Sequence, residues 1–493
     1  MAIGFLSSCR LVLSLTACIT LAPALAQPVE RLPSTVARAL QTAGIPKQNV
    51  AVIVQDATGR TPSKPQVRVN PTQAFNPASL MKLLTTYAAL ELLGPGYTWK
   101  TEAWMHGKMS DGVLQGDLVL RGSGDPKLTF EQFWLLLRQL RARGLREIRG
   151  DLVLDRSRFD SASITAAGME AFDDQPLRPY NVTPDALLLN FKALRIQLVP
   201  NPENRTLALL SEPQLGNLDI INLIKPSTHD CGNWKDALHA ELSSGNQRMQ
   251  LILSGNYPLA CGEKSWHLGV LSHPQYVEGV FRQLWQELGG SLSGSLREAT
   301  LPAGAQWLAS SVSPPLSEVL RDINKFSNNV MARQLFLTLG SEYSTFAGGT
   351  EGGAKVIRTW LQEKQLNFPE MVLENGSGLS RRERLSADSL ARLLLAAWQS
   401  PLMPEFLASL PLSAIDGTMK HRLNLQTFAG QAHVKTGSLE GVKTIAGYVH
   451  DKSGRWHIVV FLVNHANAAA SQAAQDALLR WVYDSDSASD RDS

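Results

Sequence analysis

The sequence predicts an α+β protein in which one domain of helices and strands, built from both ends of the chain, is interrupted by a long, strand-rich insertion. Three observations predict this organisation. Apolar residues recur at helical spacing over residues 76–92 and again over 316–398. Strand-like apolar segments follow over 432–464, whereas residues 101–300 read mainly as short strands and turns. A chain of 493 residues is long enough for two or three such units.

The first residues are typical of an export signal. Arg10 precedes an apolar stretch over 11–25, and Ala24-Leu25-Ala26 has the small residues that a signal peptidase accepts. We therefore expect residues 1–26 to be a signal peptide and the protein to work in the periplasm. The stretch is shorter than the roughly 20 residues of a membrane-spanning helix, so no such helix is expected in the mature protein. The Leu15-Thr16-Ala17-Cys18 segment also resembles a lipoprotein site, which would leave a lipid anchor on Cys18.

A short helix and a strand precede the first segment with chemical interest. Residues 34–43 have helical spacing, and residues 49–55 form an apolar run typical of a buried strand. Asn76 and Pro77 then favour the start of a helix, because Asn can cap it and Pro suits its first turn. Gly94-Pro95-Gly96 ends that helix.

The middle of the chain is expected to contain one clear helix, over 130–143, and strands at 116–121, 150–155, 194–199 and 249–254. It also holds Cys231 and Cys261, the two cysteines outside the export segment. In an oxidising compartment such a pair indicates a disulfide, here closing a loop of 261 − 231 = 30 residues; two unpaired buried thiols are the alternative. No further Cys or His pair nearby has ligand spacing, so no metal site is predicted.

The last third alternates from helices to strands. Helices are expected at 316–325, 330–339, 354–363 and 387–398, strands at 432–435, 444–450 and 456–464, and a final helix at 468–483. Apolar residues make up 44% of the chain and charged residues 18%, which is typical of a globular protein. The net charge of +3 gives no reason to expect nucleic acid as a partner.

Ser79-Leu80-Met81-Lys82 is an S-x-x-K sequence at the start of the first long helix. Residues three apart share a helix face, so the Lys82 amine can reach the Ser79 hydroxyl. A serine hydroxyl needs a neighbouring base, and a desolvated lysine beside other cations can be neutral enough to serve. The Ser79 N–H can act as one oxyanion donor. Alone, the motif is weak, because a helix-start serine and a surface lysine often have this spacing.

Two later segments complete a pattern. Ser327-Asn328-Asn329 has the form S-x-N, in which Ser327 can relay a proton and the Asn329 amide can orient a substrate amide. Lys435-Thr436-Gly437-Ser438 has the form K-T-G at the end of a strand. There Lys435 and Thr436 can hold a carboxylate, Gly437 leaves room for substrate backbone, and the Ser438 N–H can be the second oxyanion donor.

All three motifs in this order are the signature of penicillin-binding proteins and class A β-lactamases. The sequence resembles the class C low-molecular-mass penicillin-binding proteins, which are D-alanyl-D-alanine carboxypeptidases and endopeptidases. The gap of 327 − 79 = 248 residues matches the two-domain insertion of that family, and β-lactamases have a far shorter gap. Five further segments also match: 122–126, 150–155, 186–190, 375–381 and 416–418.

The resemblance implies a penicillin-binding/β-lactamase-like serine transpeptidase domain, with helices packed on an antiparallel sheet. It implies these boundaries: the catalytic domain over 27–96 and 303–484, insertion domain II over 97–184 and 262–302, insertion domain III over 185–261, and a disordered tail over 485–493. It also implies that Ser79 attacks the penultimate D-alanine of peptidoglycan stem peptides with Lys82 as general base. β-Lactams, which mimic that peptide end, would acylate Ser79. No cofactor is expected.

In the relatives an Asp of the insertion and an Arg of the G-S-G-L-S-R stretch help to bind the diaminopimelate side chain, and Asp155 and Arg381 stand at these positions. A strand-end Asp and a loop Arg held in salt bridges are the alternative. Two departures are notable. Glu440 replaces a Gln of some relatives, which would make the side-chain pocket more acidic. Arg333 replaces a Glu of many relatives and is expected to be a surface or helix-packing change.

Two other functions share this fold: a β-lactamase, which would deacylate quickly, and a catalytically silent peptidoglycan-binding protein. The presence of every catalytic residue argues against the silent protein, and the pattern over 186–190 argues against the β-lactamase. A metallopeptidase is not supported because no H-E-x-x-H occurs. The sequence leaves open the balance of carboxypeptidase and endopeptidase action, the third residue of the stem peptide and the oligomeric state.

Overall fold

A computed structural model of the chain describes residues 1, 31–58, 67–166, 172–173, 175–245, 248–343, 348–423 and 427–485. The expected signal peptide, Cys18 and almost all of the expected tail lie outside these residues. Within them, no helix is both long and apolar enough to cross a membrane.

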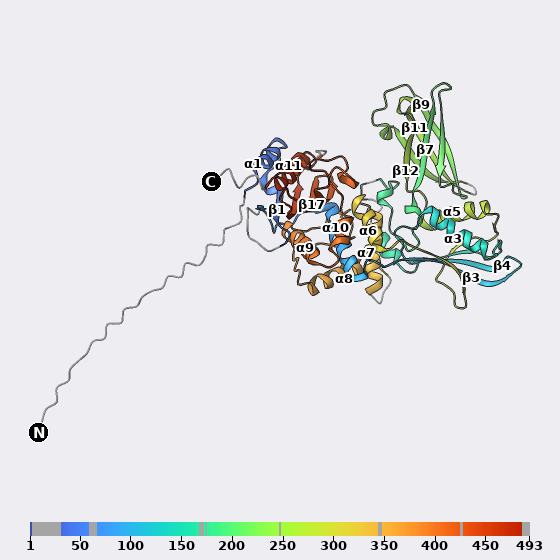
Figure 1. The fold of residues 1–493 in the computed structure, drawn as a ribbon. Helices are drawn as coiled ribbons and strands as arrows, with labels where there is room; N and C mark the ends of the chain where they lie inside the picture. The colour runs from blue at the N-terminus through green and yellow to red at the C-terminus, as the bar shows by residue number, and fades with distance from the viewer. Residues whose placement is uncertain are drawn as a thin grey trace.

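The first sheet joins strands from both ends of the chain, as Figure 1 shows by the blue and red strands lying side by side. Its five strands have the order β16-β17-β18-β1-β2, and all neighbours are antiparallel. The sheet is therefore completed by pairing of an N-terminal strand with a C-terminal strand. Its strands are β1 (Val50–Asp56), β2 (Val67–Val69), β16 (Ala432–Leu439), β17 (Val442–His450) and β18 (Trp456–Asn464).

Helices cover both faces of this sheet, because successive strand residues point to opposite sides and both sets are apolar. Ile53, Val460 and Leu462 face one core, whereas Val52 and Phe461 face the other. The first core contains α2 (Met81–Leu93), α6 (Leu316–Lys325), α7 (Asn329–Tyr343), α8 (Thr350–Glu363), α9 (Ala387–Gln399) and α10 (Met403–Ser409). The second contains α1 (Ser34–Thr42) and α11 (Gln472–Tyr483).

Helix α2 is the central element of the first core. Every residue from Met81 to Leu90 is buried, including Lys82, Thr85 and Thr86. A helix that is apolar almost all round is typical of a fully buried position. The N-terminal end of α2, which begins at Met81, is thereby held in a fixed place between the sheet and the other helices.

The insertion begins with a sheet of seven strands, whose path is β13-β5-β4-β3-β15, with β6 and β14 paired beside β4. One side of the sheet shares a core with α3 (Phe130–Ala142) and α5 (His273–Glu287), to which Leu118, Phe133 and Phe281 contribute. The strands are β3 (Lys100–Ser110), β4 (Val113–Gly122), β5 (Glu147–Ile148), β6 (Leu152–Asp155), β13 (Ser291–Leu292), β14 (Leu296–Glu298) and β15 (Gln306–Val312).

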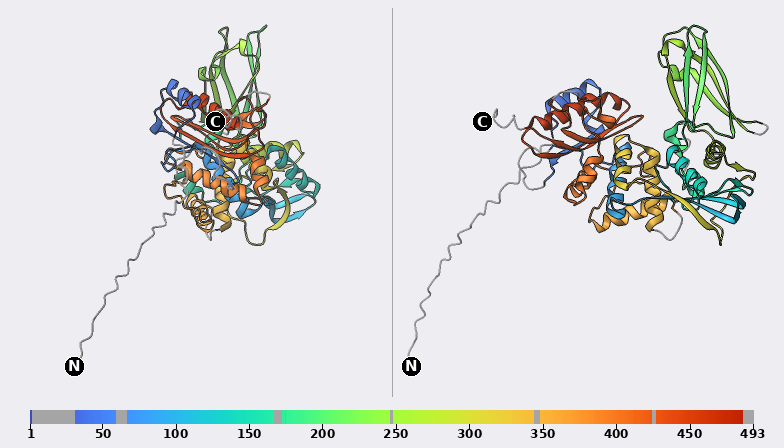
Figure 2. Two further views of the ribbon diagram at one scale, coloured as in Figure 1. Left: turned by 60° about the vertical axis from the view of Figure 1, so that its left-hand side comes forward. Right: turned by 45° about the vertical axis from the view of Figure 1, so that its right-hand side comes forward.

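A second part of the insertion consists of two three-stranded sheets, β12-β7-β8 and β10-β11-β9. Both views of Figure 2 show it projecting from the rest of the molecule. Ile196 and Leu251 contribute to a core between the sheets. The strands are β7 (Leu194–Asn201), β8 (Thr206–Glu212), β9 (Leu218–Ser227), β10 (Leu238–Ser244), β11 (Met249–Pro258) and β12 (Lys264–Leu268).

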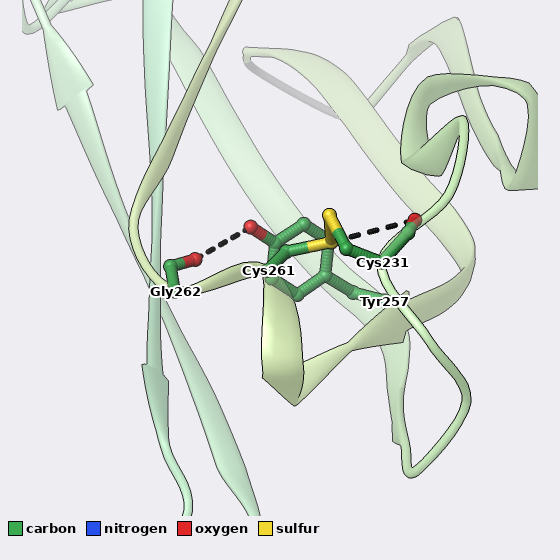
Figure 3. Close-up of a disulfide and its surroundings, with 4 residues drawn as sticks. All are labelled: Cys231, Tyr257, Cys261 and Gly262. Carbon is green, nitrogen blue, oxygen red and sulfur yellow. Dashed lines mark hydrogen bonds between the residues drawn. A yellow bond between two sulfur atoms is a disulfide. The ribbon is translucent and has the colours of Figure 1, made fainter.

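The structure joins Cys231 to Cys261 in a disulfide beside these sheets, with the two Cα atoms 4.7 Å apart (Figure 3). Next to it, the Tyr257 hydroxyl donates a hydrogen bond of 2.7 Å to the Gly262 carbonyl. The bridge thus links the loop before β10 to the chain that follows β11.

Three local expectations need correction. The middle of the chain contains a second long helix, α5, whose N-terminus has a capping box formed by Ser272 and Gln275. This S-x-x-Q pattern is readable in the sequence. Strand β12 pairs with β7 and β15 with β3, so pairing within the insertion extends past residues 261 and 302, where the boundaries were expected. Strand β16 continues to Leu439, past the expected end at Lys435, so that Thr436 and Gly437 also lie within the strand.

Candidate active site

Ser79 lies on a 3₁₀ turn, Ala78–Leu80, that leads directly into α2. The side chain of Asn76 holds this turn, because its Oδ1 accepts from Ala78 N at 2.9 Å and its Nδ2 donates to the Ser380 carbonyl at 2.8 Å. Ala78 has a φ of +47°, which is uncommon for a residue with a side chain. Ser79 is half-buried, in contrast to the buried residues on either side of it.

The loop over 375–381 packs directly against the turn. A Cβ on Gly378 would lie 1.8 Å from the Ala78 carbonyl oxygen, and Gly378 has a φ of +82°. Only glycine fits at this contact. The close approach brings the Ser377 carbonyl into reach of α2.

Lys82 is fully buried, and its side-chain nitrogen contacts three other residues of the site. Nζ lies 3.0 Å from Ser79 Oγ, 2.6 Å from Asn329 Oδ1 and 2.5 Å from the Ser377 carbonyl oxygen. Helix α2 therefore presents the lysine to the serine at the predicted spacing. Asn329 is the first residue of α7, so the base also reaches the S-x-N motif.

The surroundings of Lys82 favour its neutral form. Burial is the largest cause that lowers the pKa of Lys82 well below its usual value, followed by the charges of Lys435 and Arg333. The nearby carboxyl of Glu383 raises the pKa of Lys82 and opposes these effects. The balance shifts Lys82 towards its neutral form, which is the form that can accept a proton.

The S-x-N and K-T-G motifs meet through a second buried lysine. Lys435 is fully buried on β16, and its Nζ donates to Ser327 Oγ at 2.8 Å and to the Thr436 carbonyl at 2.7 Å. Burial lowers the pKa of Lys435 to about 7. Ser327 has a φ of +56° in the turn between α6 and α7, and this conformation aims the serine at β16.

Gly437 brings β16 against the nucleophile turn. A Cβ at this position would lie 3.0 Å from Ser79 N, 3.0 Å from the Pro77 carbonyl and 2.2 Å from Thr444 Oγ1. The Thr444 hydroxyl donates to the Pro77 carbonyl at 2.9 Å and so joins β17 to the same turn. The absence of a side chain on Gly437 lets β16 pack closely against the Ser79 turn, and the next residue on the strand is Ser438.

The outer edge of the site carries hydroxyl groups. Thr436 Oγ1 donates to Thr418 Oγ1 at 2.8 Å. Thr418 belongs to the 416–418 segment, which is anchored where Asp416 pairs with Lys325 at 2.6 Å. Gly417 allows this close packing, since a Cβ there would lie 2.5 Å from the Lys325 carbonyl. All three main motifs are therefore brought together, as the sequence predicts.

Two of the three remaining predicted residues lie together at the rim. Arg381 donates to the Glu440 carbonyl at 3.1 Å and pairs with the Glu440 carboxylate at 3.2 Å. The Arg381 guanidinium also lies 5.0 Å from the centre of the Phe172 ring, which comes from the insertion. Since Arg381 neutralises Glu440, the rim is less acidic than Glu440 alone would make it.

Asp155 has a different environment at the end of β6. Its side chain is 3% exposed and accepts hydrogen bonds from Ser157 Oγ at 2.6 Å and Leu301 N at 3.0 Å. Arg121 approaches its carboxylate at 3.5 Å. These contacts favour the structural alternative for Asp155, whereas its part in substrate recognition stays a prediction.

Sequence reasoning missed or misjudged three residues that contact Lys82 or change its pKa. Ser377 contributes a backbone carbonyl, which leaves no signature in a sequence. Glu383 is fully buried and accepts from Glu374 N and Asn375 N at 3.1 and 3.0 Å. Arg333 is 1% exposed and lies near enough to lower the pKa of Lys82, so it is not a surface residue. Its position one turn after Asn329 was the available signal.

Among the residues that the structure describes, no group of three or more His, Cys, Asp or Glu side chains is placed to hold a metal ion. The described side chains place a serine hydroxyl beside one buried lysine and hold a second buried lysine against the S-x-N serine.

Comparison with known proteins identifies relatives along almost the whole chain. The family described as "D-Ala-D-Ala carboxypeptidase 3 (S13)" matches residues 32–484. The D-alanyl-D-alanine carboxypeptidase DacB of Haemophilus influenzae is 26% identical over 395 residues, which cover 78% of this chain and 80% of that protein. The D-alanyl-D-alanine carboxypeptidase of an Actinomadura species is 28% identical over 418 residues, covering 82% of this chain and 76% of that protein.

Solved structures agree on the fold. Penicillin binding protein 4 of Haemophilus influenzae has a TM-score of 0.75 at 23% identity, covering 91% of this chain and 99% of that chain. The same protein complexed with a β-lactam has a TM-score of 0.71 at 22% identity and the same coverage.

Proposed function

Because the chain belongs to the D-Ala-D-Ala carboxypeptidase 3 (S13) family and is a serine-type D-alanyl-D-alanine carboxypeptidase of the low-molecular-mass penicillin-binding proteins, we propose that Ser79 is its nucleophile and Lys82 its general base. One observation carries this assignment. The Lys82 ammonium is fully buried, lies 3.0 Å from Ser79 Oγ, and has a pKa well below its usual value. Lowering of its pKa favours the neutral form, in which a lysine can accept the proton of a serine hydroxyl.

The acylation step follows from these positions. Neutral Lys82 accepts the Ser79 hydroxyl proton while Oγ bonds to the carbonyl carbon of the penultimate D-alanine. The negative oxygen of the tetrahedral intermediate accepts hydrogen bonds from the N–H groups of Ser79 and Ser438. The close packing of β16 at Gly437 against Ser79 N supports this placement.

The leaving group needs a proton, and the second lysine can supply it through a serine. Lys435 donates to Ser327 Oγ at 2.8 Å, so a proton can pass from Lys435 through Ser327 to the amine of the terminal D-alanine as the C–N bond breaks. In deacylation the oxygen of a water molecule bonds to the acyl carbon, one proton of that water passes to Ser79 Oγ as the C–Oγ bond breaks, and the proton left on Lys82 returns to Lys435. Ser79 and both lysines end in their starting states.

Recognition is proposed to use both sides of the cleaved bond. Lys435 and Thr436 bind the terminal carboxylate, and the Asn329 amide binds the peptide on the acyl side. Arg381 and Glu440, which pair at 3.2 Å, lie where the third residue of the stem peptide can contact them. Peptidoglycan stem peptides and β-lactams share the carboxylate and the reactive carbonyl, so both are expected to acylate Ser79.

We further propose that cross-linked stem peptides are substrates, since the cross-link is also an amide of D-alanine and the attack is the same. Because its proposed substrate, peptidoglycan, lies outside the cytoplasm, the protein is proposed to be exported. The expected signal peptide over 1–26 supports the periplasm, with a lipid anchor on Cys18 as the alternative.

The test is intact mass of the purified protein mixed with excess benzylpenicillin and followed over hours, with peptide mapping. A long-lived adduct on Ser79 that is absent in Ser79→Ala is the expected result. Accumulation of hydrolysed penicillin without an adduct would instead mean a β-lactamase. Absence of both adduct and hydrolysis would mean a silent binding protein.

A further inference from the structure

Arg333 is a buried cation in a place where the mechanism above assigns none. It lies on α7, one helical turn after Asn329, and is 1% exposed. Arginine is seldom buried to this degree unless it is held by specific contacts. Here the guanidinium donates to the Tyr180 carbonyl at 2.7 Å and approaches the Asn329 carbonyl at 3.4 Å.

These contacts connect Arg333 to the general base through one residue. Asn329 meets Arg333 with its backbone carbonyl, and it meets Lys82 with its side-chain oxygen at 2.6 Å. Tyr180 lies on a 3₁₀ turn of the insertion, Pro179–Asn181. Arg333 therefore ties the start of α7 to the insertion at the point where α7 presents Asn329 to Lys82.

The charges that face Lys82 come from three elements: Lys435 on β16, Arg333 on α7 and Glu383 in the loop before α9. Lys435 cannot hold a constant charge around neutral pH, because burial lowers its own pKa to about 7. A guanidinium stays protonated at every pH at which the enzyme folds. Of these two cations, Arg333 is therefore the one whose effect on Lys82 persists above neutral pH.

We propose that Arg333 is a positioning residue for acylation: its fixed charge keeps Lys82 in the neutral, proton-accepting form, and its contacts with Tyr180 and Asn329 hold Asn329 against Lys82. This inference rests on the proposed roles of Ser79 and Lys82. It supplies a reason for a buried arginine at this position. Lowering of the pKa of Lys82 by the Arg333 charge agrees with it.

Two substitutions separate charge from hydrogen bonding. Arg333→Gln removes the charge but retains a donor for the Tyr180 carbonyl, whereas Arg333→Lys retains the charge. The second-order rate constant for acylation by benzylpenicillin is measured from pH 5 to 10 for each variant, per Ser79 site titrated by the adduct. This rate constant reports groups of the free enzyme. Partial unfolding of a variant then lowers the number of Ser79 sites that form the adduct, but it does not change the acylation rate constant per site.

The acid limb of the profile is expected to move upward by about one pH unit in Arg333→Gln, which slows acylation about tenfold at a pH below that limb. Arg333→Lys should keep the acid limb of the unsubstituted enzyme. The alkaline limb should stay in place in both variants, because burial and not Arg333 lowers the pKa of Lys435. Arg321→Gln, which removes an exposed charge from α6, is the matched control and should shift neither limb.

An acid limb that does not move in Arg333→Gln, together with a lower melting temperature in both variants, would show a structural role alone and overturn the inference. An equal shift in Arg333→Gln and Arg333→Lys would overturn it too, because the charge would then be irrelevant. Failure of the proposed function looks different: the unsubstituted enzyme would form no adduct on Ser79 at any pH.

Discussion

The Lys82 ammonium lies 2.6 Å from the side-chain oxygen of Asn329, although 247 residues separate them in the sequence. The same ammonium lies 3.0 Å from Ser79 Oγ, only three residues away. One contact of the base is therefore local to a helix, and the other exists only because the chain returns after the insertion. The segments before and after the insertion must therefore fold together before Lys82 is held in place.

The pH dependence of acylation should have an alkaline limb that belongs to Lys435. Burial lowers the pKa of Lys435 to about 7, so the free enzyme loses this charge as the pH rises through that value. We propose that the charged form binds the substrate carboxylate and supplies the leaving-group proton, so kcat/KM should fall above about pH 7. Measurement of kcat/KM against pH for a D-Ala-D-Ala peptide checks this. Lys435→Arg cannot lose its charge in this range and should show no alkaline limb, even if it is slower; a limb at the same pH in that variant would assign it elsewhere.

A methyl group at Gly437 should disable the enzyme. An alanine Cβ would lie 3.0 Å from Ser79 N and 2.2 Å from Thr444 Oγ1, so it would displace the strand or block the N–H that binds the oxyanion. Loss of one such donor lowers a rate by about 100-fold or more. The acylation rate of Gly437→Ala checks this, with Gly96→Ala as the control, because Gly96 has ordinary φ and no atom within 4 Å of a Cβ. An acylation rate of Gly437→Ala equal to that of the unsubstituted enzyme would show that the close packing at Gly437 is not needed for acylation.

Substitution of Asp155 should change stability rather than selectivity. Asp155→Asn weakens hydrogen bonds from Ser157 and Leu301 in a buried site, so unfolding should become easier by about 1–3 kcal/mol. Cleavage of diaminopimelate-containing peptides and of simple D-Ala-D-Ala esters should fall by the same factor. Arg381→Ala is the comparison, and it should lower cleavage of the diaminopimelate peptide more than that of the ester. A selective loss in Asp155→Asn would instead assign Asp155 to substrate recognition.

Removal of the disulfide should affect the insertion and spare the chemistry. Cys231 and Cys261 close a loop with a sequence separation of 30 residues, and a bridge of this length stabilises by about 3–4 kcal/mol in the chain-entropy model. Cys231→Ser with Cys261→Ser should therefore lower the unfolding midpoint of the paired sheets that contain β7 to β12. The rate of penicillin adduct formation on Ser79 should stay the same at a temperature where the variant is folded. A slower adduct under those conditions would show that the insertion is coupled to acylation.

Much of the site could be predicted because its signals are local. The spacing of Ser79 and Lys82 on a helix, the S-x-N turn and the K-T-G strand each need only a few neighbouring residues, and their order identifies the family. The five-stranded sheet with helices on both faces agrees with the α+β fold expected. The error over α5 was avoidable, since Ser272 and Gln275 form a capping box that the sequence contains.

The sequence by itself determined which groups are the candidates for the chemistry, because motif spacing along a helix or strand depends on local geometry alone. Only the tertiary structure decided how those groups are tuned. The burial of Lys82 and Lys435, the Ser377 carbonyl, and the inward position of Arg333 all depend on contacts between segments far apart in the chain. Such contacts leave no periodic pattern in a sequence, yet they set the proton affinity of the two lysines, since desolvation and neighbouring charges act through space.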